Sequence, residues 1–342
     1  MIKILALETS CDETAVAVVD SHKRILAHVI RSQIEEHQLY GGVVPELASR
    51  AHLDFLPSLV TEALKQARLG YGDVSAIAAT TGPGLMGGLL VGATFAKAVA
   101  FARNLPFLGI NHLEGHALTV RLTHDVPFPY LLLLTSGGHC QILEVRGVGD
   151  YKELGTTLDD AAGEAFDKVA KMLGLGFPGG PAVEKMALKG QPNIPLPRPL
   201  MEQNNYNFSF SGLKTAVLQY QQKHAPLSPQ TVADLCASFQ AAVRDCFVNR
   251  LTKAIQALPL CQHVVVAGGV AANVYLRDAL QELCTQQGRI FVAPPLALCT
   301  DNAAMIGWAA MERFRLGYQD PLTLRPRPRW PLKELTSCNT GF

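Results

Sequence analysis

The chain has 342 residues, 48% of them hydrophobic, which is enough for two domains that each bury a core. Its 30 lysines and arginines nearly balance 29 aspartates and glutamates. The net charge of +1 excludes a global positive field that would attract nucleic acid or anionic lipid, so any such partner must meet a local basic patch.

The cysteines form no Cys-x-x-Cys pair, which argues against a zinc knuckle and against a disulfide framework. The apolar run at residues 1–7 is too short for a signal peptide and ends at Glu8. We therefore expect a protein of the reducing cytoplasm.

The first predicted elements are two strands, residues 2–7 and 15–19, around the polar turn 8–14. An apolar strand at 77–81 then leads through a Gly-Pro-Gly turn into a helix. Residues 84–102 are apolar enough to be tested as a membrane span, but Lys97 and the preceding glycine turn are typical of a buried helix. We predict no membrane span.

Residues 111–120 predict a helix on which His112 and His116 project from one face, the spacing that lets two imidazoles share a cation. Glu114 lies roughly 200° around this helix from His112, so it cannot be the metal-adjacent base of a His-Glu-x-x-His protease. The alternative for an isolated pair is that neighbouring carbonyls satisfy both histidines.

A second hairpin is predicted from strands at 130–134 and 141–145. Its turn offers backbone N–H groups and a hydroxyl to an anion, although a hairpin without a ligand would use the same glycines. The residues of this turn are Thr135, Ser136, Gly137, Gly138 and His139.

Asp160, Glu164 and Asp167 are predicted to share one face of a helix. A solvated acidic face near a helix start explains them, and the functional alternative is that Asp167 accepts hydrogen bonds from ribose hydroxyls. The Phe-Pro-Gly-Gly-Pro segment at 177–181 offers another wall where a ligand can approach the backbone closely.

Residues 192–198 and 202–205 are rich in proline and polar side chains, which predicts a surface excursion. Lys214 follows it and lies either near an anion or in solvent. A strand at 264–267 then leads to Gly268 and Gly269, and these glycines with the amide of Asn273 suit a purine ribose at a helix start.

Asp301 follows a predicted strand at 289–293 and precedes a helix that begins near Asn302. It is either a third, harder metal ligand or the N-cap of that helix. Residues 325–330, Arg-Pro-Arg-Pro-Arg-Trp, cannot form a regular helix and predict an ordered surface tail.

The repeated pattern of hairpin, strand, glycine turn and helix predicts a duplicated α/β unit, with two RNase H-like lobes of the actin, Hsp70 and sugar-kinase class around a cleft. We expect the first lobe at 1–112 plus 302–335, the second at 113–301 with an inserted surface segment near 190–215, and a tail at 336–342. Cys11, Cys140 and Cys299 adjoin the expected cleft, either as thiol nucleophiles or, as we favour, as small buried residues.

Seven segments in order resemble one family, the bacterial tRNA threonylcarbamoyladenosine transferases, formerly labelled glycoproteases. The resemblance runs from residue 1 to about 333, and it departs from the family pattern at Cys140, where threonine is usual, and after Leu335. The segments are Glu-Thr-Ser-Cys-Asp-Glu-Thr at 8–14, Gly-Gly-Val-Val-Pro-Glu-Leu-Ala-Ser-Arg at 41–50, His-Leu-Glu-Gly-His at 112–116, Ser-Gly-Gly-His at 136–139, Ala-Gly-Glu-Ala-Phe-Asp-Lys at 162–168, Phe-Ser-Phe-Ser-Gly-Leu-Lys-Thr at 208–215 and Cys-Thr-Asp-Asn at 299–302.

The resemblance implies transfer of threonylcarbamoyl from threonylcarbamoyl-AMP to the N6 amine of adenosine 37, in tRNAs that read codons beginning with A, with release of AMP. It also implies one divalent iron or zinc ion per subunit on His112, His116 and Asp301. The adenylate would contact residues 135–139, Asp167, Gly180, Glu184 and Asn273, beside the nucleotide wall of Gly268 and Gly269.

Asp12, Glu13 and His139 are candidates for the general base, and Lys214, Arg325, Arg327 and Arg329 are candidates for contacts with the tRNA anticodon loop. The resemblance further implies two partner subunits, a smaller non-catalytic paralogue and a P-loop ATPase. Two other functions stay open from the residues alone: a nucleotide-binding ATPase or chaperone-like regulatory subunit, and a metalloprotease.

Overall fold

The computed structural model describes residues 1–38, 40 and 42–335, which form two compact units. Unit 1 comprises Met1–Asp125, Gly147–Tyr151 and Asp301–Phe342, and unit 2 comprises Val126–Arg146 and Lys152–Thr300. Residues 113–125, 147–151 and Asp301 therefore belong to unit 1, whereas the sequence placed them in the second lobe. The expected tail at 336–342 and Gly41 of one motif lie outside the described residues.

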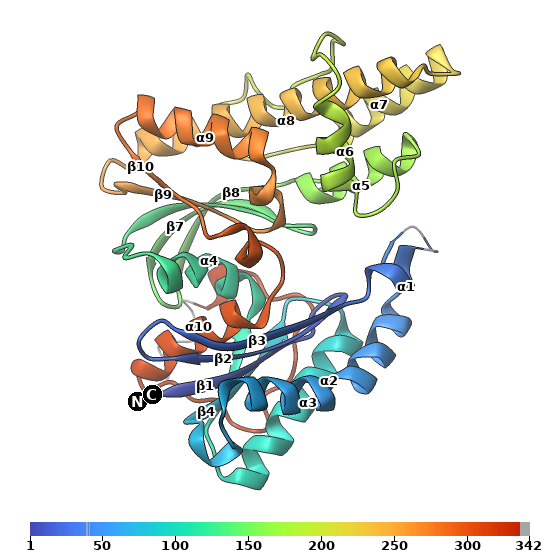
Figure 1. The fold of residues 1–342 in the computed structure, drawn as a ribbon. Coiled ribbons are helices and arrows are strands. Elements are labelled where there is room, and N and C mark those ends of the chain that lie inside the picture. Colours follow the sequence, from blue (N-terminus) through green and yellow to red (C-terminus); the bar gives the residue numbers. More distant parts are fainter. Residues whose placement is uncertain (39, 41, 336–342) are drawn as a thin grey trace. The chain divides into compact units, whose positions relative to one another are not determined.

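Unit 1 is built on a five-stranded sheet in the order β3-β2-β1-β4-β5 (Figure 1). β1 pairs antiparallel with β2, as the predicted hairpin requires, while β4 pairs parallel with both β1 and β5. The strands are β1 Lys3–Glu8, β2 Glu13–Asp20, β3 Ile25–Ser32, β4 Ala76–Gly82 and β5 Phe107–Asn111.

Helices cover both faces of this sheet, which explains why β1, β2, β4 and β5 are buried almost throughout, whereas the edge strand β3 is largely exposed. Leu5 and Leu7 join the core beneath α2 and α3, whereas a Cβ on Gly307 of α10 would lie 3.2 Å from Ala6 on the other face. The helices of unit 1 are α1 Ile34–Gln38, α2 Pro45–Ala67, α3 Met86–Arg103, α4 His112–Thr123 and α10 Ala303–Arg315, with short 3-10 turns at Tyr71–Asp73 and Leu332–Glu334.

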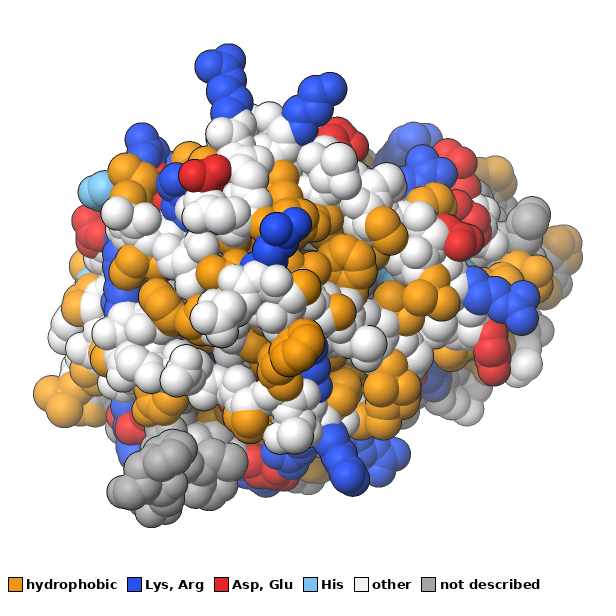
Figure 2. Space-filling view, turned by 90° about the horizontal axis from the view of Figure 1, so that it is seen from below, with side chains coloured by type: hydrophobic (Ala, Val, Ile, Leu, Met, Phe, Trp, Pro, Cys, Tyr) orange, Lys and Arg blue, Asp and Glu red, His pale blue; other side chains and the backbone are white. Residues whose placement is uncertain are grey.

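Helix α3 alone, among the described helices, is long and apolar enough to cross a membrane by length and composition. It packs against β4 and α2, and its Leu89, Ala93 and Ala96 are buried. Figure 2 shows the molecule from below, where hydrophobic side chains are interspersed with polar and basic ones. One face of α3 is therefore packed against unit 1, while Leu90 and Phe101 on its other side are exposed.

Unit 2 repeats the sheet of unit 1, in the order β10-β9-β6-β7-β8. β6 and β7 form the antiparallel hairpin, and β9 pairs parallel with β6 and β10, so the predicted duplication is confirmed. The strands are β6 Tyr130–Thr135, β7 Cys140–Gly147, β8 Asp150–Thr156, β9 His263–Ala267 and β10 Ile290–Val292.

Five helices complete unit 2, and the excursion near 190–215 runs between two of them. Arg250 of α8 is buried and donates to the carbonyl oxygens of Gln203 and Asn205, which orders this excursion. The elements are α5 Ala162–Met172, α6 Gly179–Ala187, α7 Ser211–His224, α8 Pro229–Ala257 and α9 Val274–Gln286, with 3-10 turns at Gly269–Ala272 and Leu296–Leu298.

Candidate metal centre and nucleotide-binding residues

Helix α4 begins where β5 ends, and Asn111 fixes that junction. Its side-chain oxygen accepts hydrogen bonds from the backbone N–H groups of Leu113 and Glu114 at 2.9 and 3.3 Å. This N-cap starts the helix at His112 and places His116 one turn further on the same face, as the spacing predicted.

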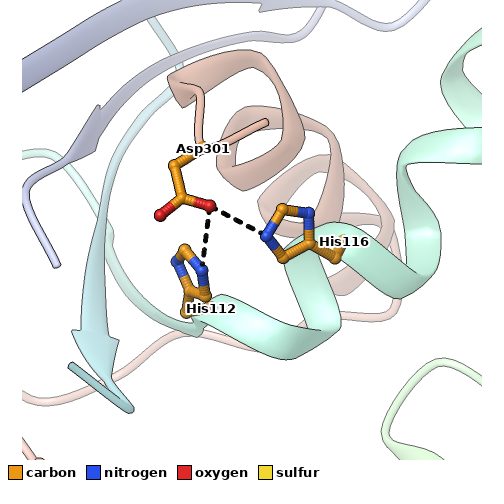
Figure 3. Close-up of side chains that lie close together, drawn as sticks. All are labelled: His112, His116 and Asp301. Atoms are coloured by element: carbon orange, nitrogen blue, oxygen red, sulfur yellow. Dashed lines mark hydrogen bonds and ion pairs between the residues drawn. The ribbon is translucent and has the colours of Figure 1, made fainter. Parts of the chain in front are cut away.

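Three side chains of unit 1 converge in front of this face (Figure 3). The Oδ1 atom of Asp301 lies 3.0 Å from His116 Nε2 and 3.4 Å from His112 Nε2. One ligand atom from each residue lies within 4.8 Å of the other two. Two imidazoles and a carboxylate that leave coordination positions open are typical of catalytic zinc or iron sites, so these residues fit a divalent transition metal.

The alternative role of Asp301 as a helix cap is wrong. Asn302 caps α10, because its side-chain oxygen accepts the N–H of Met305 at 2.9 Å. The helix is therefore started by the neighbouring residue, and the carboxylate of Asp301 is directed at the histidines.

Glu8 is a fourth member of this cluster that the sequence analysis did not assign. It is 1% exposed at the end of β1, and its Oε2 lies 3.1 Å from His112 Nδ1 and accepts a 2.5 Å hydrogen bond from Thr80. Ser10 Oγ also lies 3.0 Å from His112 Nδ1. These contacts orient the ring so that its Nε2 faces Asp301.

The charges of the cluster favour a cation. Burial lowers the pKa of His112, but the negative charges of Asp301 and Glu8 outweigh it and hold that pKa well above the usual range. Burial raises the pKa of Asp301, yet His112 and His116 bring it well below its usual range overall. Two carboxylates thus stabilise positive charge at this point, whether it is carried by a proton or by a metal.

Asp12 ends the turn that follows Glu8 between β1 and β2, and Glu13 is the first residue of β2, in the same unit. Asp12 is buried. Burial raises the pKa of the Glu13 carboxyl well above its usual range, and the negative charges of Asp301 and Asp12 raise it further. The turn therefore brings two more carboxyl groups to the electronegative neighbourhood of the triad.

Glu114, the acid inside the His-Leu-Glu-Gly-His motif, points away from the triad, as predicted. Its carboxylate accepts hydrogen bonds from Arg313 Nε at 2.5 Å, from the Tyr151 hydroxyl at 3.0 Å and from the Gly149 N–H at 3.0 Å. Glu114 is 0% exposed and ties α4 to α10 and to residues 147–151, so its role is structural.

In unit 2, the turn between β6 and β7 is built around two exposed glycines, Gly137 and Gly138, where a Cβ would meet nothing within 4 Å. Ser136 closes the turn: its N–H donates to the His139 carbonyl at 2.8 Å, and its hydroxyl accepts the His139 N–H at 3.2 Å. The glycine backbone is therefore accessible to an anion.

The end of β9 lies against this turn, and Gly268 makes the contact. Its φ is +93°, and a Cβ there would lie 2.5 Å from the Thr135 carbonyl oxygen, so a glycine is required. Gly269, the next residue, faces open space, as does Gly180 at the start of α6.

Two acidic residues predicted to contact a nucleotide hold helix starts in unit 2. Asp167 Oδ1 accepts the N–H of Gly179 at 2.8 Å, and Glu184 Oε1 accepts the N–H of Val274 at 2.7 Å. Asn273 caps α9 and donates to Gln240 at 2.9 Å. Of these three residues only Glu184 lines a cavity of about 620 Å³, together with residues that include Pro181, Gln240, Val274 and Tyr275.

The predicted acidic face of α5 is wrong at one position. The helix starts at Ala162, so Asp160 precedes it and does not share a helical face with Glu164 and Asp167. Asp160 instead forms ion pairs with Lys168 at 2.9 Å and with Lys214 at 2.7 Å. Lys214, a candidate for tRNA contact, is therefore engaged within unit 2.

The arginine-rich segment at 325–330 is irregular and lies along unit 1. The Arg327 N–H donates to the Thr81 carbonyl at 2.7 Å, and the Trp330 carbonyl accepts from the Asn111 side chain at 2.8 Å. Arg327 also pairs with Glu334, whereas Arg325 and Arg329 are exposed. The segment crosses the ends of β4 and β5, beside the residue that caps α4.

The three cysteines considered as nucleophiles are poor candidates. Cys140 and Cys299 are buried, and burial raises the pKa of both thiols. Burial and the charge of Asp12 also raise the pKa of Cys11 above its usual range. These thiols stay protonated at neutral pH, as expected for small buried residues.

Comparison with known proteins agrees with this chemistry. The family model for tRNA N6-adenosine threonylcarbamoyltransferase (TsaD) matches residues 24–308. A protein of that name from Brucella anthropi is 58% identical over 350 residues, covering 99% of this chain and 98% of the relative. Another from Rhodospirillum rubrum is 59% identical over 343 residues, covering 96% and 94%. Among solved structures, HypF from T. kodakarensis shares the fold, with a TM-score of 0.62 at 14% identity, covering 92% of this chain and 48% of that one.

Proposed function

The chain belongs to the tRNA N6-adenosine threonylcarbamoyltransferase family, and from this premise we propose how its residues perform the transfer. The substrate is threonylcarbamoyl-AMP, and the acceptor is the N6 amine of adenosine 37 in tRNAs that read codons beginning with A. The observation that carries the proposal is the convergence of His112, His116 and Asp301 in a chain of this family.

In the reaction, the N6 nitrogen forms a bond to the carbamoyl carbon, the bond from that carbon to the phosphate oxygen breaks, and AMP leaves. An aromatic amine is a weak nucleophile, so the enzyme must hold the two reactants together and stabilise negative charge on the carbamoyl oxygen. The amine also loses a proton, for which Asp12, Glu13 and His139 are the candidate acceptors.

We propose that His112, His116 and Asp301 hold one divalent iron or zinc ion. When bound, such an ion supplies Lewis acidity toward carbonyl or carboxylate oxygens of the threonylcarbamoyl group. Glu8 supports this role by orienting His112, and the surrounding carboxylates supply the negative charge that favours a cation.

The adenylate is assigned to unit 2. The exposed backbone of Gly137 and Gly138, within the turn 135–139, and the open space at Gly180 and Gly269 suit the close approach of a phosphate and a ribose. Asp167, Glu184 and Asn273 lie at the starts of α6 and α9, and Glu184 also lines a cavity whose volume of about 620 Å³ is within the range of ligand pockets.

The acceptor tRNA needs a local basic surface because the net charge is only +1. Arg325 and Arg329 are exposed and lie beside Trp330, so they are our candidates for phosphate contacts, with Arg327 holding their segment in place. An anticodon-loop base is already partly unstacked, so presenting it costs less than flipping a base out of a duplex. Lys214 is a weaker candidate because Asp160 already binds it.

Two partner subunits are proposed on family membership, a smaller non-catalytic paralogue and a P-loop ATPase, with another enzyme supplying the adenylate. The cytoplasm is our proposed location for this reaction. No contact surface is assigned to either subunit.

The direct test is a reconstituted assay with threonylcarbamoyl-AMP labelled in its carbamoyl carbon. We expect label in a tRNA with adenosine at position 37, none in the same tRNA with guanosine there, and loss of transfer after chelation with recovery on adding Fe²⁺ or Zn²⁺. Nucleotide binding without labelled tRNA, when both partner subunits are present, would favour the regulatory ATPase. Cleavage of a glycoprotein by the purified chain would favour the protease.

A further inference from the structure

A chain of buried hydrogen bonds runs behind the turn that carries Asp12 and Glu13. Its side chains are Thr14 on β2, Gln33 before α1, His37 on α1 and His52 on α2, and all four are 0% exposed. The roles described above use none of them. Buried polar side chains need hydrogen-bond partners inside the protein, and the partners of these four are one another and nearby backbone groups.

The chain of hydrogen bonds starts at a backbone N–H and ends at a backbone carbonyl, which fixes the direction of donation along it. The Val44 N–H donates to His37 Nδ1 at 3.3 Å, so the proton of His37 is on Nε2, which donates to Gln33 Oε1 at 3.2 Å. Gln33 Nε2 then donates to Thr14 Oγ1 at 3.3 Å.

The second half of this hydrogen-bond chain reaches the turn between β1 and β2. Thr14 Oγ1 donates to His52 Nδ1 at 2.8 Å, and His52 Nε2 donates to the Cys11 carbonyl at 3.0 Å. A second anchor lies alongside, because the Gln33 N–H donates to the Asp12 carbonyl at 3.2 Å. The carbonyl oxygens of Cys11 and Asp12 therefore both accept hydrogen bonds from the residues behind the turn.

Every donor in this hydrogen-bond chain meets an acceptor only if the imidazoles of His37 and His52 are neutral and carry their proton on Nε2. A protonated His37 has no acceptor atom for the Val44 N–H, and a protonated His52 has none for the Thr14 hydroxyl or for Gln33 Nε2, which lies 3.4 Å from His52 Nδ1. Burial also lowers the pKa of His52, which agrees with the neutral ring.

We propose that His52 is a positioning residue for the transfer reaction, which holds the turn of Asp12 and Glu13 in place through its hydrogen bond to the Cys11 carbonyl. The proposal rests on the proposed function, in which this turn adjoins the metal triad. Loss of the hydrogen bond lets the turn shift, while His112, His116 and Asp301 keep their own contacts. A displacement of about 1 Å at a reacting group can lower the rate about 100-fold.

The first test is the tautomer of the two rings, read from the ¹⁵N NMR spectrum of histidine-labelled full-length protein. His52→Gln and His37→Gln assign the signals. We expect both rings to be neutral at pH 7 with the proton on Nε2. A charged ring, or a proton on Nδ1 of His52, would overturn the proposal, and this readout does not depend on whether the protein transfers threonylcarbamoyl.

The second test is kinetic. Thr14→Val and His52→Leu are each expected to lower kcat about tenfold or more, with unchanged KM for threonylcarbamoyl-AMP and a full equivalent of bound Zn²⁺. His52→Gln keeps a donor for the Cys11 carbonyl and should restore most of kcat. The matched control is His28→Gln, which should keep the kcat of wild type, since His28 is a partly buried histidine of β3 that takes no part in this hydrogen-bond chain.

These outcomes distinguish a failure of the positioning role of His52 from a failure of the proposed function. A kcat within twofold of wild type in folded His52→Leu, or no difference between His52→Leu and His52→Gln, refutes the positioning role. If wild type itself transfers nothing in the presence of its partner subunits, the proposed function fails, whereas the hydrogen-bond chain is still judged by the NMR result.

Discussion

The carboxylate of Glu8 lies 3.1 Å from Nδ1 of His112, on the opposite side of the ring from Asp301. This contact places the proton of a neutral His112 on Nδ1 and leaves Nε2 available as a ligand. We predict that Glu8→Gln weakens Zn²⁺ affinity about 10- to 100-fold, measured by competition with a chelating dye. The matched control is Glu312→Gln, a buried glutamate of α10 outside the cluster; equal affinities in both variants would contradict the role of Glu8.

Asp301 and Asn302 are neighbours with separable roles. Asp301→Ala should lose bound metal, as should His116→Ala, because each removes one of three ligands. Asn302→Ala should keep the metal and lower the free energy of unfolding by about 1 kcal/mol, because it removes the cap of α10. Metal analysis and urea unfolding of the three proteins check this, and a full equivalent of metal in Asp301→Ala would refute the site.

Glu114 is predicted to matter for stability and not for metal binding. Its bond to Arg313 is buried, and removing one partner of a buried pair costs about 3–5 kcal/mol. Urea unfolding of Glu114→Ala should show this loss, with the folded protein still binding one equivalent of Zn²⁺. Asp125→Asn, which breaks the exposed pair with Lys23, should leave stability unchanged. A Glu114 variant that folds normally but loses the metal would contradict this assignment.

Gly268 and Gly269 should respond differently to the same added methyl group. Gly268→Ala forces a positive φ on an alanine and drives its Cβ into the Thr135 carbonyl, so unit 2 should be destabilised by more than about 1 kcal/mol. Gly269→Ala meets open space, so stability should hold while affinity for threonylcarbamoyl-AMP falls. Thermal unfolding and calorimetric titration distinguish the two variants. An unchanged affinity of Gly269→Ala for threonylcarbamoyl-AMP would exclude Gly269 as a ligand contact.

We predict that His52 makes the free energy of unfolding decrease as the pH falls. Burial lowers its pKa, partly offset by the Cys11 carbonyl and by the charges of Glu8 and Asp12, while His37 lowers it further. The stabilising contribution is therefore complete above the unfolded value of about 6.5 and is lost as the pH falls below it toward the folded pKa. His52→Gln should show a smaller loss of unfolding free energy on acidification below about pH 6.5 than wild type. The exposed His22→Gln should behave as wild type, and identical pH profiles for all three proteins would refute this.

Much of the architecture was predictable because it depends on local patterns. The alternation of strands and glycine turns predicted both hairpins, and the four-residue spacing of His112 and His116 predicted a shared face. The position of Asp301 came from its family motif, since spacing alone allowed it to be a helix cap. Only the structure shows that Asn302 takes that role.

Glu8 and His52 were not predictable in the same way, because their partners are distant in the chain. Glu8 meets His112 only after β1 and β5 join one sheet, and His52 meets Cys11 only after α2 packs behind β2. One signal was present: a carboxylate that ends an apolar strand is expected to be buried, and a buried charge needs a partner. The position of Asp160 outside α5 was missed because helical spacing was extended past the actual helix start.

The most direct test of the account is nucleoside mass spectrometry of tRNA from a strain depleted of this protein and complemented with wild type, Glu312→Gln or His116→Ala. We predict that threonylcarbamoyladenosine disappears on depletion, returns with wild type and Glu312→Gln, and stays absent with His116→Ala. Persistence of the modified nucleoside after depletion, or its full return with His116→Ala, would contradict transfer at this centre.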